Sequence, residues 1–429
     1  MRVLWICNTI LNEFTEEFHL RKKPFEGWIE GLWNELKTDK YLEIGMCFPI
    51  IDEWRMKNSV YNGYKYYSYH AIMDHGSYCR KYKKEFQYIL KDFQPDVVHI
   101  WGTERNHSRA VVEACSDLGI DNRVAVRVQG IISACATYYT VGVPRKYYPL
   151  KSDGVTSIYD EVKKFRKIAN NEYIIWSHAA CICERSDWGE FYIKQINPHI
   201  WVEKFDNILR ESFYKNCGKW NFLRCTKHII FVSEAHYSIK GLHFLLKAAE
   251  ILKKKYSDIE IRIAGNNLFD VKYGYGYKVF IKNLIDAYDL QNNVSYIGLL
   301  SADEMVQEYL NANVFVSSSV IENRANSICE AMMLGTPTIA SYVGGNIGVI
   351  RHGVDGYYYP ASDYSLLAGY IDRIFTDKEL AKSISKEAVK SALQRHDKVR
   401  IKNIILKIYS QITERAGTNL NKSIWGEVK

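Results

Sequence analysis

Short β-branched runs alternate with helical patterns along most of the chain. In the first half they predict buried strands at Val3–Cys7, Leu42–Cys47, Val97–Ile100 and Val124–Val128. In the second half they predict strands at His228–Val232, Ile259–Ala264, Val294–Ile297, Val314–Ser317 and Thr338–Ala340. Apolar strands separated by helices are typical of parallel sheets covered on both faces. The pattern therefore predicts two doubly wound α/β domains that bind ligands at the carboxyl ends of their strands.

Helical periodicity fills the gaps between these strands. One apolar helix face is predicted from Leu242, Leu245, Leu246, Ala249 and Leu252. Ser301 and Glu304 have the spacing of a capping box and predict the start of another helix. The segment 160–221 is rich in aromatic residues and poor in glycine, and we expect helices that close the first domain.

The length of 429 residues predicts two domains, because a single core seldom organises so long a chain. We place the first domain at 1–222 and the second at 223–400, with the join near Cys217–Thr226. The segment 401–429 carries an isoleucine stripe at helical spacing. Such a stripe needs a packing partner, for which the first domain is the candidate.

Composition excludes several classes of protein. Hydrophobic residues make up 47% of the chain and charged residues 25%, which argues against disorder. The apolar runs fall short of the ~18 residues of a membrane span. The opening apolar stretch stops at Asn8 and is interpreted as a buried strand rather than a leader. Ten cysteines without a Cys-x-x-Cys pair favour reduced thiols, so we expect a cytoplasmic protein.

The net charge of +8 is not concentrated in a basic arm. The short clusters Arg80–Lys84 and Lys163–Lys167 are typical of solvated helix faces. The sequence therefore predicts no nucleic-acid partner. A peripheral contact with the inner face of a membrane remains open for these clusters.

Two carboxylates lie where a loop is predicted to enter a helix. Glu322 is on the loop, and Glu330 follows eight residues later in the first turn of the helix that Ser327 would cap and Gly335 would end. Unpaired N–H groups near Asn326 and Ser327 would face an anionic ligand. Ser327 and Glu330 also have capping-box spacing, which needs no ligand. Both interpretations of Glu330 stay open, whereas no cap explains Glu322.

A second candidate follows the strand that ends at Val232. Lys240 lies at the entrance of the next helix, where its charge adds to the partial positive charge of the helix and suits a diphosphate. Gly241 would let the backbone approach that ligand. A solvated lysine is the alternative interpretation.

Taken together, three motifs resemble the family-four retaining glycosyltransferases of GT-B fold, also called group 1 glycosyltransferases. The motifs are Lys240-Gly241, the pair Glu322-x7-Glu330, and the segment 340–345 with its two glycines. The resemblance covers residues 228–360 well, and the amino half more loosely through 24–28, 96–104 and 184–188. It implies two facing Rossmann-like domains with an interdomain cleft, the acceptor on the first and the nucleotide-sugar on the second.

The resemblance also implies roles for individual residues. Glu322 would touch donor-sugar hydroxyls beside the anomeric carbon, and Asn326 and Ser327 would lie on the backbone that binds the far side of the sugar. Glu330 would bind the ribose hydroxyls. Lys240 would neutralise the departing diphosphate, whose charge develops mainly in the transition state.

The amino half and three departures from the family pattern complete this picture. Gly27 would let a first-domain loop approach the phosphates. Gln129 stands where many members have a histidine facing the donor sugar, and it can hydrogen-bond a hydroxyl without carrying a proton. Ala235 replaces the usual phosphate-binding arginine, for which Arg324 is a substitute to consider. Gly348 replaces a common acidic residue.

The chemistry that the resemblance implies needs no protein base. The departing phosphate oxygen accepts the proton of the acceptor hydroxyl, and the enzyme contributes positioning and electrostatics. We therefore expect His99, His107 and His178 to be structural. The sequence contains no Asp-x-Asp, so we predict no metal site and no cofactor besides the donor.

The sequence thus predicts a retaining, metal-independent hexosyltransferase. Its donor would be a UDP- or GDP-linked hexose, and its acceptor a growing glycan, lipid-linked or otherwise bearing a hydroxyl, in bacterial cell-surface polysaccharide or glycoconjugate synthesis. Two alternatives remain. Ala235 encourages the interpretation as an inactive GT-B partner subunit, and a nucleotide-sugar epimerase would use the same donor pocket with titratable groups beside it.

Overall fold

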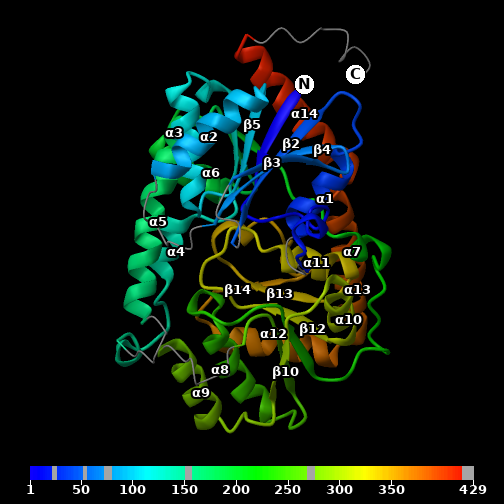
Figure 1. Ribbon diagram of the computed structural model, residues 1–429. Helices are drawn as coiled ribbons and strands as arrows, with labels where there is room; N and C mark the ends of the chain where they lie inside the picture. The colour runs from blue at the N-terminus through cyan, green and yellow to red at the C-terminus, as the bar shows by residue number, and fades with distance from the viewer. Residues whose placement is uncertain (22–26, 52–55, 72–79, 150–156, 268–275, 418–429) are drawn as a thin grey trace. The chain divides into compact units, whose positions relative to one another are not determined.

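The computed structural model describes residues 1–21, 27–51, 56–71, 80–149, 157–267 and 276–417 (Figure 1). The chain forms two compact units. Unit 1 holds the described residues of Met1–Ser133, Lys164–Ile208 and Asp397–Lys429, and unit 2 holds those of Ala134–Lys163 and Leu209–His396.

This division differs from a single boundary after residue 222. The chain passes into unit 2 already at Leu209, and the indole N–H of Trp220 donates to the carbonyl of Ala312 at 2.8 Å. The earlier segment Ala134–Lys163 also belongs to unit 2, where the ring of Tyr147 packs on that of Phe280. A hydrogen bond of Trp220 and a ring contact of Tyr147, neither of which a linear pattern reveals, thus connect these segments to unit 2.

Unit 1 is built on one eight-stranded sheet of order β3-β4-β2-β1-β5-β6-β7-β8, in which β3 runs antiparallel to β4 and the other neighbours are parallel. Its strands are β1 (Arg2–Ile6), β2 (Glu43–Ile50), β3 (Lys57–Tyr61), β4 (Tyr64–His70), β5 (Val97–Trp101), β6 (Val124–Arg127), β7 (Cys181–Glu184) and β8 (Trp201–Lys204). The four strands predicted in this half are confirmed as β1, β2, β5 and β6.

The other four strands of unit 1 are not predicted from the sequence pattern. Strands β7 and β8 are four residues long and lie in the segment expected to be helical. The hairpin β3-β4 turns at Asn62 and Gly63, whose φ angles are 50° and 84°. Positive φ at both turn residues is the signature of a tight hairpin, so this Asn-Gly pair is a sequence signal for the two strands.

The helices of unit 1 are α1 (Gly27–Leu36), α2 (Arg80–Phe93), α3 (Asn106–Asp117), most of α5 (Ile158–His178), α6 (Asp187–Ile196) and α14 (Lys398–Arg415). Helix α14 packs on α1 and β5 of this unit. The hydroxyl of Tyr409 on α14 accepts a hydrogen bond from the indole of Trp5 at 3.0 Å and contacts Nδ1 of His99 at 2.7 Å. The isoleucine stripe of the last helix therefore buries itself against the amino-terminal sheet.

Unit 2 is built on six parallel strands of order β11-β10-β9-β12-β13-β14. They are β9 (Ile229–Val232), β10 (Glu260–Ala264), β11 (Val294–Gly298), β12 (Val314–Ser317), β13 (Thr338–Ser341) and β14 (Tyr357–Tyr359). The five predicted strands are confirmed, and β14 is an addition. Counted along the chain the order is 3-2-1-4-5-6, so the direction of winding reverses between β9 and β12.

The helices of unit 2 are α7 (Glu211–Lys215), α8 (Leu242–Lys253), α9 (Gly276–Ala287), α10 (Ala302–Asn311), α11 (Asn326–Leu334), α12 (Tyr364–Thr376) and α13 (Lys378–Arg395), with α4 (Ile132–Tyr138) at a boundary between the units. Helices α8 and α12 pack together on one face of the sheet, and α10, α11 and α13 on the other (Figure 1). The predicted capping box at Ser301 and Glu304 opens α10.

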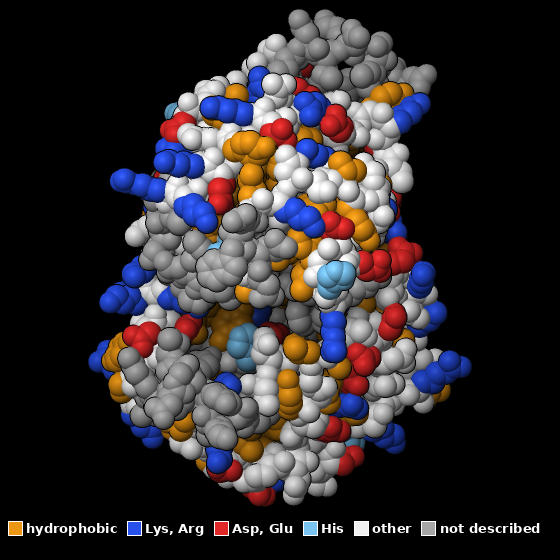
Figure 2. Space-filling view, in the orientation of Figure 1, with side chains coloured by type: hydrophobic (Ala, Val, Ile, Leu, Met, Phe, Trp, Pro, Cys, Tyr) orange, Lys and Arg blue, Asp and Glu red, His pale blue; other side chains and the backbone are white. Residues whose placement is uncertain are grey.

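Lysine and arginine side chains are interspersed with acidic ones on the face drawn in Figure 2. None of the described helices is long and apolar enough to cross a membrane.

Candidate functional site

The candidate site lies in unit 2, where β9 and β12 end side by side. Parallel strands whose connections leave in opposite directions open a crevice at their carboxyl ends. A pocket occupies this position and is lined by Val232, Ser233, Glu234, Lys240, Phe315, Val316, Ser317, Ser318, Ser319, Glu322, Ala325 and Ser327. The fold therefore brings Lys240, Glu322 and Ser327 into one pocket.

Lys240 and Glu322 form an ion pair in this pocket. Lys240 Nζ lies 2.8 Å from Glu322 Oε2, and each side chain is 19% exposed. The hydroxyl of Ser319 donates to the same carboxylate oxygen at 3.1 Å. Burial by itself would lower the pKa of Lys240, but the Glu322 carboxylate outweighs it and the pKa is raised. The site thus keeps a permanent positive charge next to a fixed carboxylate.

Residue 241 is a glycine, and this allows the loop that carries Lys240 to contact the loop that follows β12. Its φ is 67°, and a Cβ at this position would lie 1.9 Å from the carbonyl oxygen of Ser318. The hydroxyl of Ser318 also donates to the carbonyl of Lys240 at 2.9 Å. The close approach that this glycine permits is to the loop after β12, which brings Lys240 within reach of Glu322.

The loop that carries Glu322 is held from the other side by the turn after β13. The amide of Gly345 donates to the carbonyl of Glu322 at 2.8 Å. At Gly344, whose φ is 50°, a Cβ would lie 2.3 Å from that same carbonyl oxygen. Asn346 Oδ1 accepts from the amide of Ala325 at 3.0 Å. Gly344 is therefore required by its packing against the Glu322 backbone, and Gly345 contributes its amide.

Arg324 takes part in this packing as well. Its backbone is left-handed, with φ of 58°, and its Nε donates to the carbonyl of Gly345 at 3.4 Å. Gly348, where the family often has an acidic residue, has φ of 84°. A residue other than glycine would be strained there, which gives a structural reason for this departure.

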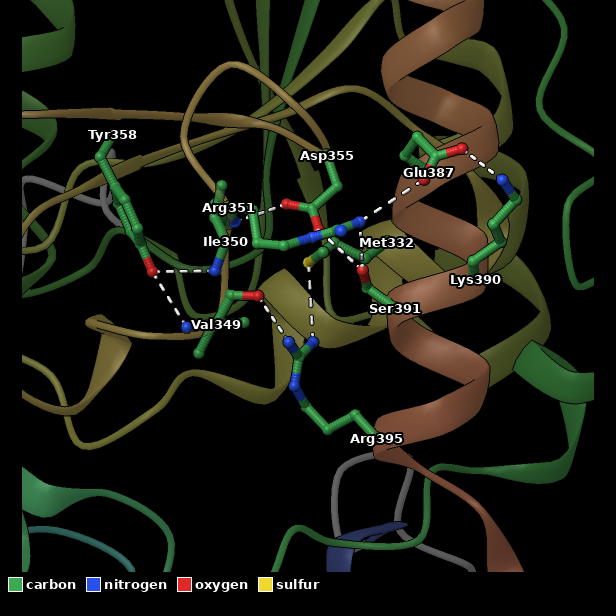
Figure 3. A network of polar contacts seen from close by, with 10 residues as sticks. All are labelled: Met332, Val349, Ile350, Arg351, Asp355, Tyr358, Glu387, Lys390, Ser391 and Arg395. Atoms are coloured by element: carbon green, nitrogen blue, oxygen red, sulfur yellow. Dashed lines mark hydrogen bonds and ion pairs between the residues drawn. The ribbon is translucent and has the colours of Figure 1, made fainter.

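A polar network ties the segment that follows this turn, from Val349 to Tyr358, to helices α11 and α13 (Figure 3). Arg395 on α13 donates to the carbonyl of Val349 at 2.6 Å and reaches the sulfur of Met332 on α11 at 4.0 Å. Arg351 reaches the carboxylate of Glu387 on α13 at 3.6 Å. Side-chain hydrogen bonds and an ion pair thus connect the segment after this turn to helices α11 and α13.

Helix α11 begins earlier than the sequence predicts. Its first residue is Asn326 and its N-cap is Ala325, which makes no side-chain cap. The predicted N-cap at Ser327 and its capping box with Glu330 are therefore wrong. The reason is that Asn346 binds the amide of Ala325, so the chain turns into the helix before Ser327 is reached. The predicted end is confirmed, because Gly335 is left-handed with φ of 84°.

Glu330 is engaged by two residues outside its own helix. Its Oε1 accepts from Arg210 Nη2 at 2.9 Å, and its Oε2 lies 3.4 Å from the hydroxyl of Tyr309, which also donates to the carbonyl of Ser327 at 3.1 Å. Burial raises the pKa of Glu330, while Arg210 and Tyr309 pull it down. Arg210 is 120 residues away in the chain, and no local spacing links it to the helix.

A third carboxylate, Glu234, lines the pocket next to Ala235. Glu234 Oε1 accepts from the amide of Ala235 at 2.8 Å and contacts His236 Nδ1 at 2.7 Å. Burial alone would raise the pKa of Glu234, but hydrogen bonds from His236 and the backbone lower it. Where relatives of the predicted family place an arginine, this chain therefore presents a carboxylate and imidazole pair that the sequence motifs do not indicate.

The remaining predicted site residues lie elsewhere. Gln129 follows β6 in unit 1, and its carbonyl accepts from Arg185 Nη2 at 3.0 Å. Gly27 is the first residue of α1, also in unit 1, and residues 24–26 of its motif lie outside the described residues. Asn326, in unit 2, is the first residue of α11.

The three histidines considered as bases all have protein partners. His99 Nδ1 contacts Tyr409, and His178 Nδ1 lies 2.8 Å from the carbonyl of Ile174. His107 Nε2 lies 2.9 Å from Asn8 Oδ1, and burial lowers the pKa of His107 to about 3. Within the described ranges, no group of three or more His, Cys, Asp or Glu side chains is arranged to hold a metal ion.

Comparison with known proteins finds similarity over the segment that carries this site. Residues 219–391 match the model of the family described as glycosyl transferases group 1. The chain is 31% identical over 199 residues to the putative glycosyltransferase YtcC of Bacillus subtilis, covering 45% of this chain and 46% of that one. It is 26% identical over 234 residues to the amylovoran biosynthesis glycosyltransferase AmsK of Erwinia amylovora, covering 51% of each. The chain spans about half the length of the curated relatives it matches.

Solved structures extend the likeness over nearly the whole chain. Sucrose-phosphate synthase from Thermosynechococcus elongatus has a TM-score of 0.69 at 15% identity, covering 97% of this chain and 100% of the other. Anabaena HepE in complex with UDP-glucose has a TM-score of 0.65 at 15% identity, covering 98% and 100%. The chain therefore has the GT-B fold that the sequence predicts.

Proposed function

We propose that this chain, whose residues 219–391 belong to the group 1 glycosyl transferases, transfers a hexose from a nucleotide-sugar to a glycan hydroxyl with retention of anomeric configuration. The observation that carries the proposal is the ion pair of Lys240 and Glu322 at the end of β9 and β12. A nucleotide bound at this edge would place its diphosphate against Lys240 and its sugar against the loop of Glu322.

In the proposed mechanism, the positive charge of Lys240 is in position before the donor binds. The diphosphate of the donor already carries one negative charge on each phosphate. A second negative charge develops on its terminal phosphate as the glycosidic bond breaks, and Lys240 lies ready to meet it without reorganisation. Glu322 keeps the lysine oriented before the donor enters. The acceptor hydroxyl passes its proton to the departing phosphate oxygen as its own oxygen bonds to the anomeric carbon. This step requires neither a protein base nor a metal ion, and we propose that the enzyme is metal-independent.

The donor is a UDP-hexose in this proposal, with a GDP-hexose as the second choice. UDP is favoured because the solved structure of HepE, which shares the fold, holds UDP-glucose. The acceptor is a growing glycan of a bacterial surface polysaccharide, lipid-linked or free. AmsK supports this assignment, since its name places it in amylovoran biosynthesis. The proposed location is the cytoplasm, with a peripheral contact to the membrane where the acceptor is lipid-linked.

The test compares donor hydrolysis by the wild-type protein and by Glu322→Gln, without added acceptor. UDP-glucose, UDP-galactose and GDP-mannose are incubated with each protein, and the release of the nucleoside diphosphate is followed. The proposal expects slow release from one donor by the wild type and its loss in the folded variant. An inactive partner subunit would release nothing from any donor, and an epimerase would convert the sugar without releasing nucleotide.

A further inference from the structure

A groove of about 390 Å³ lies on unit 2 between α13 and the loop that leads into β9. Trp220 and Phe222 of the loop line it together with three lysines of α13. Among the described residues that line this groove, none is acidic. None of them lines the candidate pocket at the ends of β9 and β12, so the groove is a second surface of unit 2.

The three lysines share one face of α13 and are exposed. They are Lys382, Lys386 and Lys390, four residues apart, and side chains at this spacing follow one another along one side of a helix. Lys382 pairs with Glu379 at 3.0 Å, and Lys390 pairs with Glu387 (Figure 3). Helix α13 has five basic residues and two acidic ones, so this pairing leaves an excess of positive charge.

The loop adds further positive charge and an apolar tip. The segment 218–227 contains three basic residues and no acidic one. Leu223 is 72% exposed, the highest value among the large apolar side chains of the described residues. A single exposed leucine is ordinary on a protein surface, but this one follows Phe222 of the lysine-lined groove directly in the chain.

Hydrogen bonds hold the loop in this shape. The amide of Trp220 donates to the carbonyl of Leu334 at 3.0 Å. At the tip, the amide of Leu223 donates to Asn221 Oδ1 at 2.9 Å, and the amide of Arg224 donates to the carbonyl of Asn221 at 3.0 Å. A fixed turn therefore presents the leucine to water, and a partner that covers its side chain would be bound without ordering the loop first.

We propose that this face of unit 2, made of the groove and the loop 218–227, binds the surface of an anionic phospholipid bilayer. A lipid phosphate would lie in the groove among the three lysines, and Leu223 would enter the boundary between head groups and acyl chains. A free anion or an acidic glycan would also match the lysines, but neither would cover the leucine. The inference gives a place and a lipid chemistry to the membrane contact of the proposed function, and it rests on that function for the lipid-linked acceptor.

The lysines and the leucine should contribute in different ways. A lysine near an anionic bilayer strengthens binding about fivefold, so three lysines should strengthen it about a hundredfold. Burial of a leucine side chain should add about tenfold. Salt screens the contribution of the lysines and leaves that of the leucine, so the two can be separated by ionic strength.

The experiment is sedimentation of the full chain with vesicles of phosphatidylcholine, with or without one third of phosphatidylglycerol, at low and high salt. One variant is the triple substitution Lys382→Gln, Lys386→Gln, Lys390→Gln, and the other is Leu223→Ser. Circular dichroism and thermal unfolding check that each variant is folded. If the triple variant does not fold, Lys386→Gln alone replaces it.

Matched controls remove the same chemical groups from other surfaces. The triple substitution Lys81→Gln, Lys83→Gln, Lys84→Gln removes three lysines from α2 of unit 1, in a basic cluster for which the sequence leaves a membrane contact open. Both triple variants change the net charge by the same amount. Phe191→Ser removes an aromatic side chain that is 63% exposed on α6. Both controls should bind vesicles as the wild type does.

We expect the wild type to bind anionic vesicles at least about tenfold more tightly than neutral ones. The triple variant of α13 should bind anionic vesicles about a hundredfold more weakly than the wild type at low salt, and Lys386→Gln about fivefold more weakly. High salt should narrow both differences. Leu223→Ser should bind about tenfold more weakly at either salt concentration.

Wild-type affinity of the folded α13 variant for anionic vesicles would overturn the proposal, and so would an equal loss in the α2 control. Unchanged binding by Leu223→Ser would overturn it as well. Calorimetric binding of inorganic phosphate or alginate through the α13 lysines, without binding to vesicles, would assign the groove to a free anion or a glycan and contradict the proposal. Donor hydrolysis needs no vesicle, so failure of the proposed function is measured separately.

Discussion

The ammonium of Lys240 lies 2.8 Å from the carboxylate of Glu322, although 82 residues separate them in the chain. The parallel strands β9 and β12 bring them together, and Gly241 allows their loops to touch. Because the pair sits where the winding of the sheet reverses, it marks the place at which a nucleotide-sugar is expected to bind.

Replacement of Glu322 by Gln or Ala should abolish transfer and leave the fold intact. The carboxylate is held by Lys240 and Ser319 and caps no helix, so its loss should cost activity more than secondary structure. Turnover and circular dichroism are to be measured on the same sample. A folded Ala variant with near-wild-type turnover would remove Glu322 from the proposed site.

Lys240→Ala should lower kcat/KM by about 10²–10³, since it removes a charge that meets the leaving diphosphate. With Ala235 in place of the family's arginine, little else compensates. The control is Lys247→Ala on α8, which also removes a lysine charge but from a residue that does not line the pocket. The ammonium of Lys247 instead lies 5.7 Å from the ring centroid of Phe244. A loss under about fivefold would assign the phosphate to another cation, with Arg324 as the next target.

Glu330→Gln should weaken binding of the nucleoside diphosphate by about ten- to a hundredfold. The structure excludes the capping role, and glutamine can still accept from Arg210 with its amide oxygen. The melting temperature should therefore change much less than the affinity. Calorimetry and thermal unfolding check both quantities, and equal affinities would return Glu330 to a structural role.

The contribution of Glu172 to stability should fall as the pH rises from about 5 to 8, while the burial of neutral His107 contributes the opposite trend below about pH 6.5. Burial raises the pKa of Glu172 from 4.5 to about 8. Between these values the native state holds a proton that the unfolded chain has released, so stability decreases as pH increases, by at most about 1.4 kcal/mol per pH unit. Glu172→Gln removes this titration, so the difference in stability between the two proteins should change with pH over this range. Thermal unfolding midpoints of both proteins at half-unit steps of pH test this, and parallel curves would contradict it.

Activity should survive excess EDTA once carried-over metal has been removed. The motivation is the absence of Asp-x-Asp from the sequence together with the placement of Lys240, whose charge takes the part that a divalent ion plays elsewhere. Loss of transfer that manganese or magnesium restores would overturn the proposed chemistry.

The sequence predicted the unit 2 sheet almost completely because its strands are short, apolar and separated by clear helices. Strand β12 has the predicted bounds, and β9, β10, β11 and β13 differ by one residue at an end. The prediction was weakest for two kinds of strand. Strand β7 is too short for its apolar pattern to be recognised, and β4 consists mainly of tyrosines with a lysine rather than of aliphatic residues. The pair Asn62-Gly63 was the available signal for β3 and β4.

The sequence predicts individual residues of the site but not the contacts between them. Motif spacing indicated Lys240, Glu322 and Glu330, but neither the ion pair nor Arg210 can be read from spacing, because tertiary contacts join residues that lie far apart. The capping box at Ser327 failed because Asn346, from another loop, decides where α11 begins. The capping box predicted at Ser301 and Glu304 is confirmed, because both of its hydrogen bonds form within the first turn of the helix that it starts.

The central claim is that Lys240 meets the diphosphate of a nucleotide-sugar. It is tested most directly by calorimetric titration of UDP, UDP-glucose and GDP into the wild type, Lys240→Ala and Lys247→Ala. UDP carries the charge of the leaving group, so Lys240→Ala should weaken UDP by about tenfold or more and UDP-glucose by less, while Lys247→Ala changes neither. Wild-type affinity of Lys240→Ala for UDP, or wild-type protein that binds neither UDP nor GDP, would contradict the account.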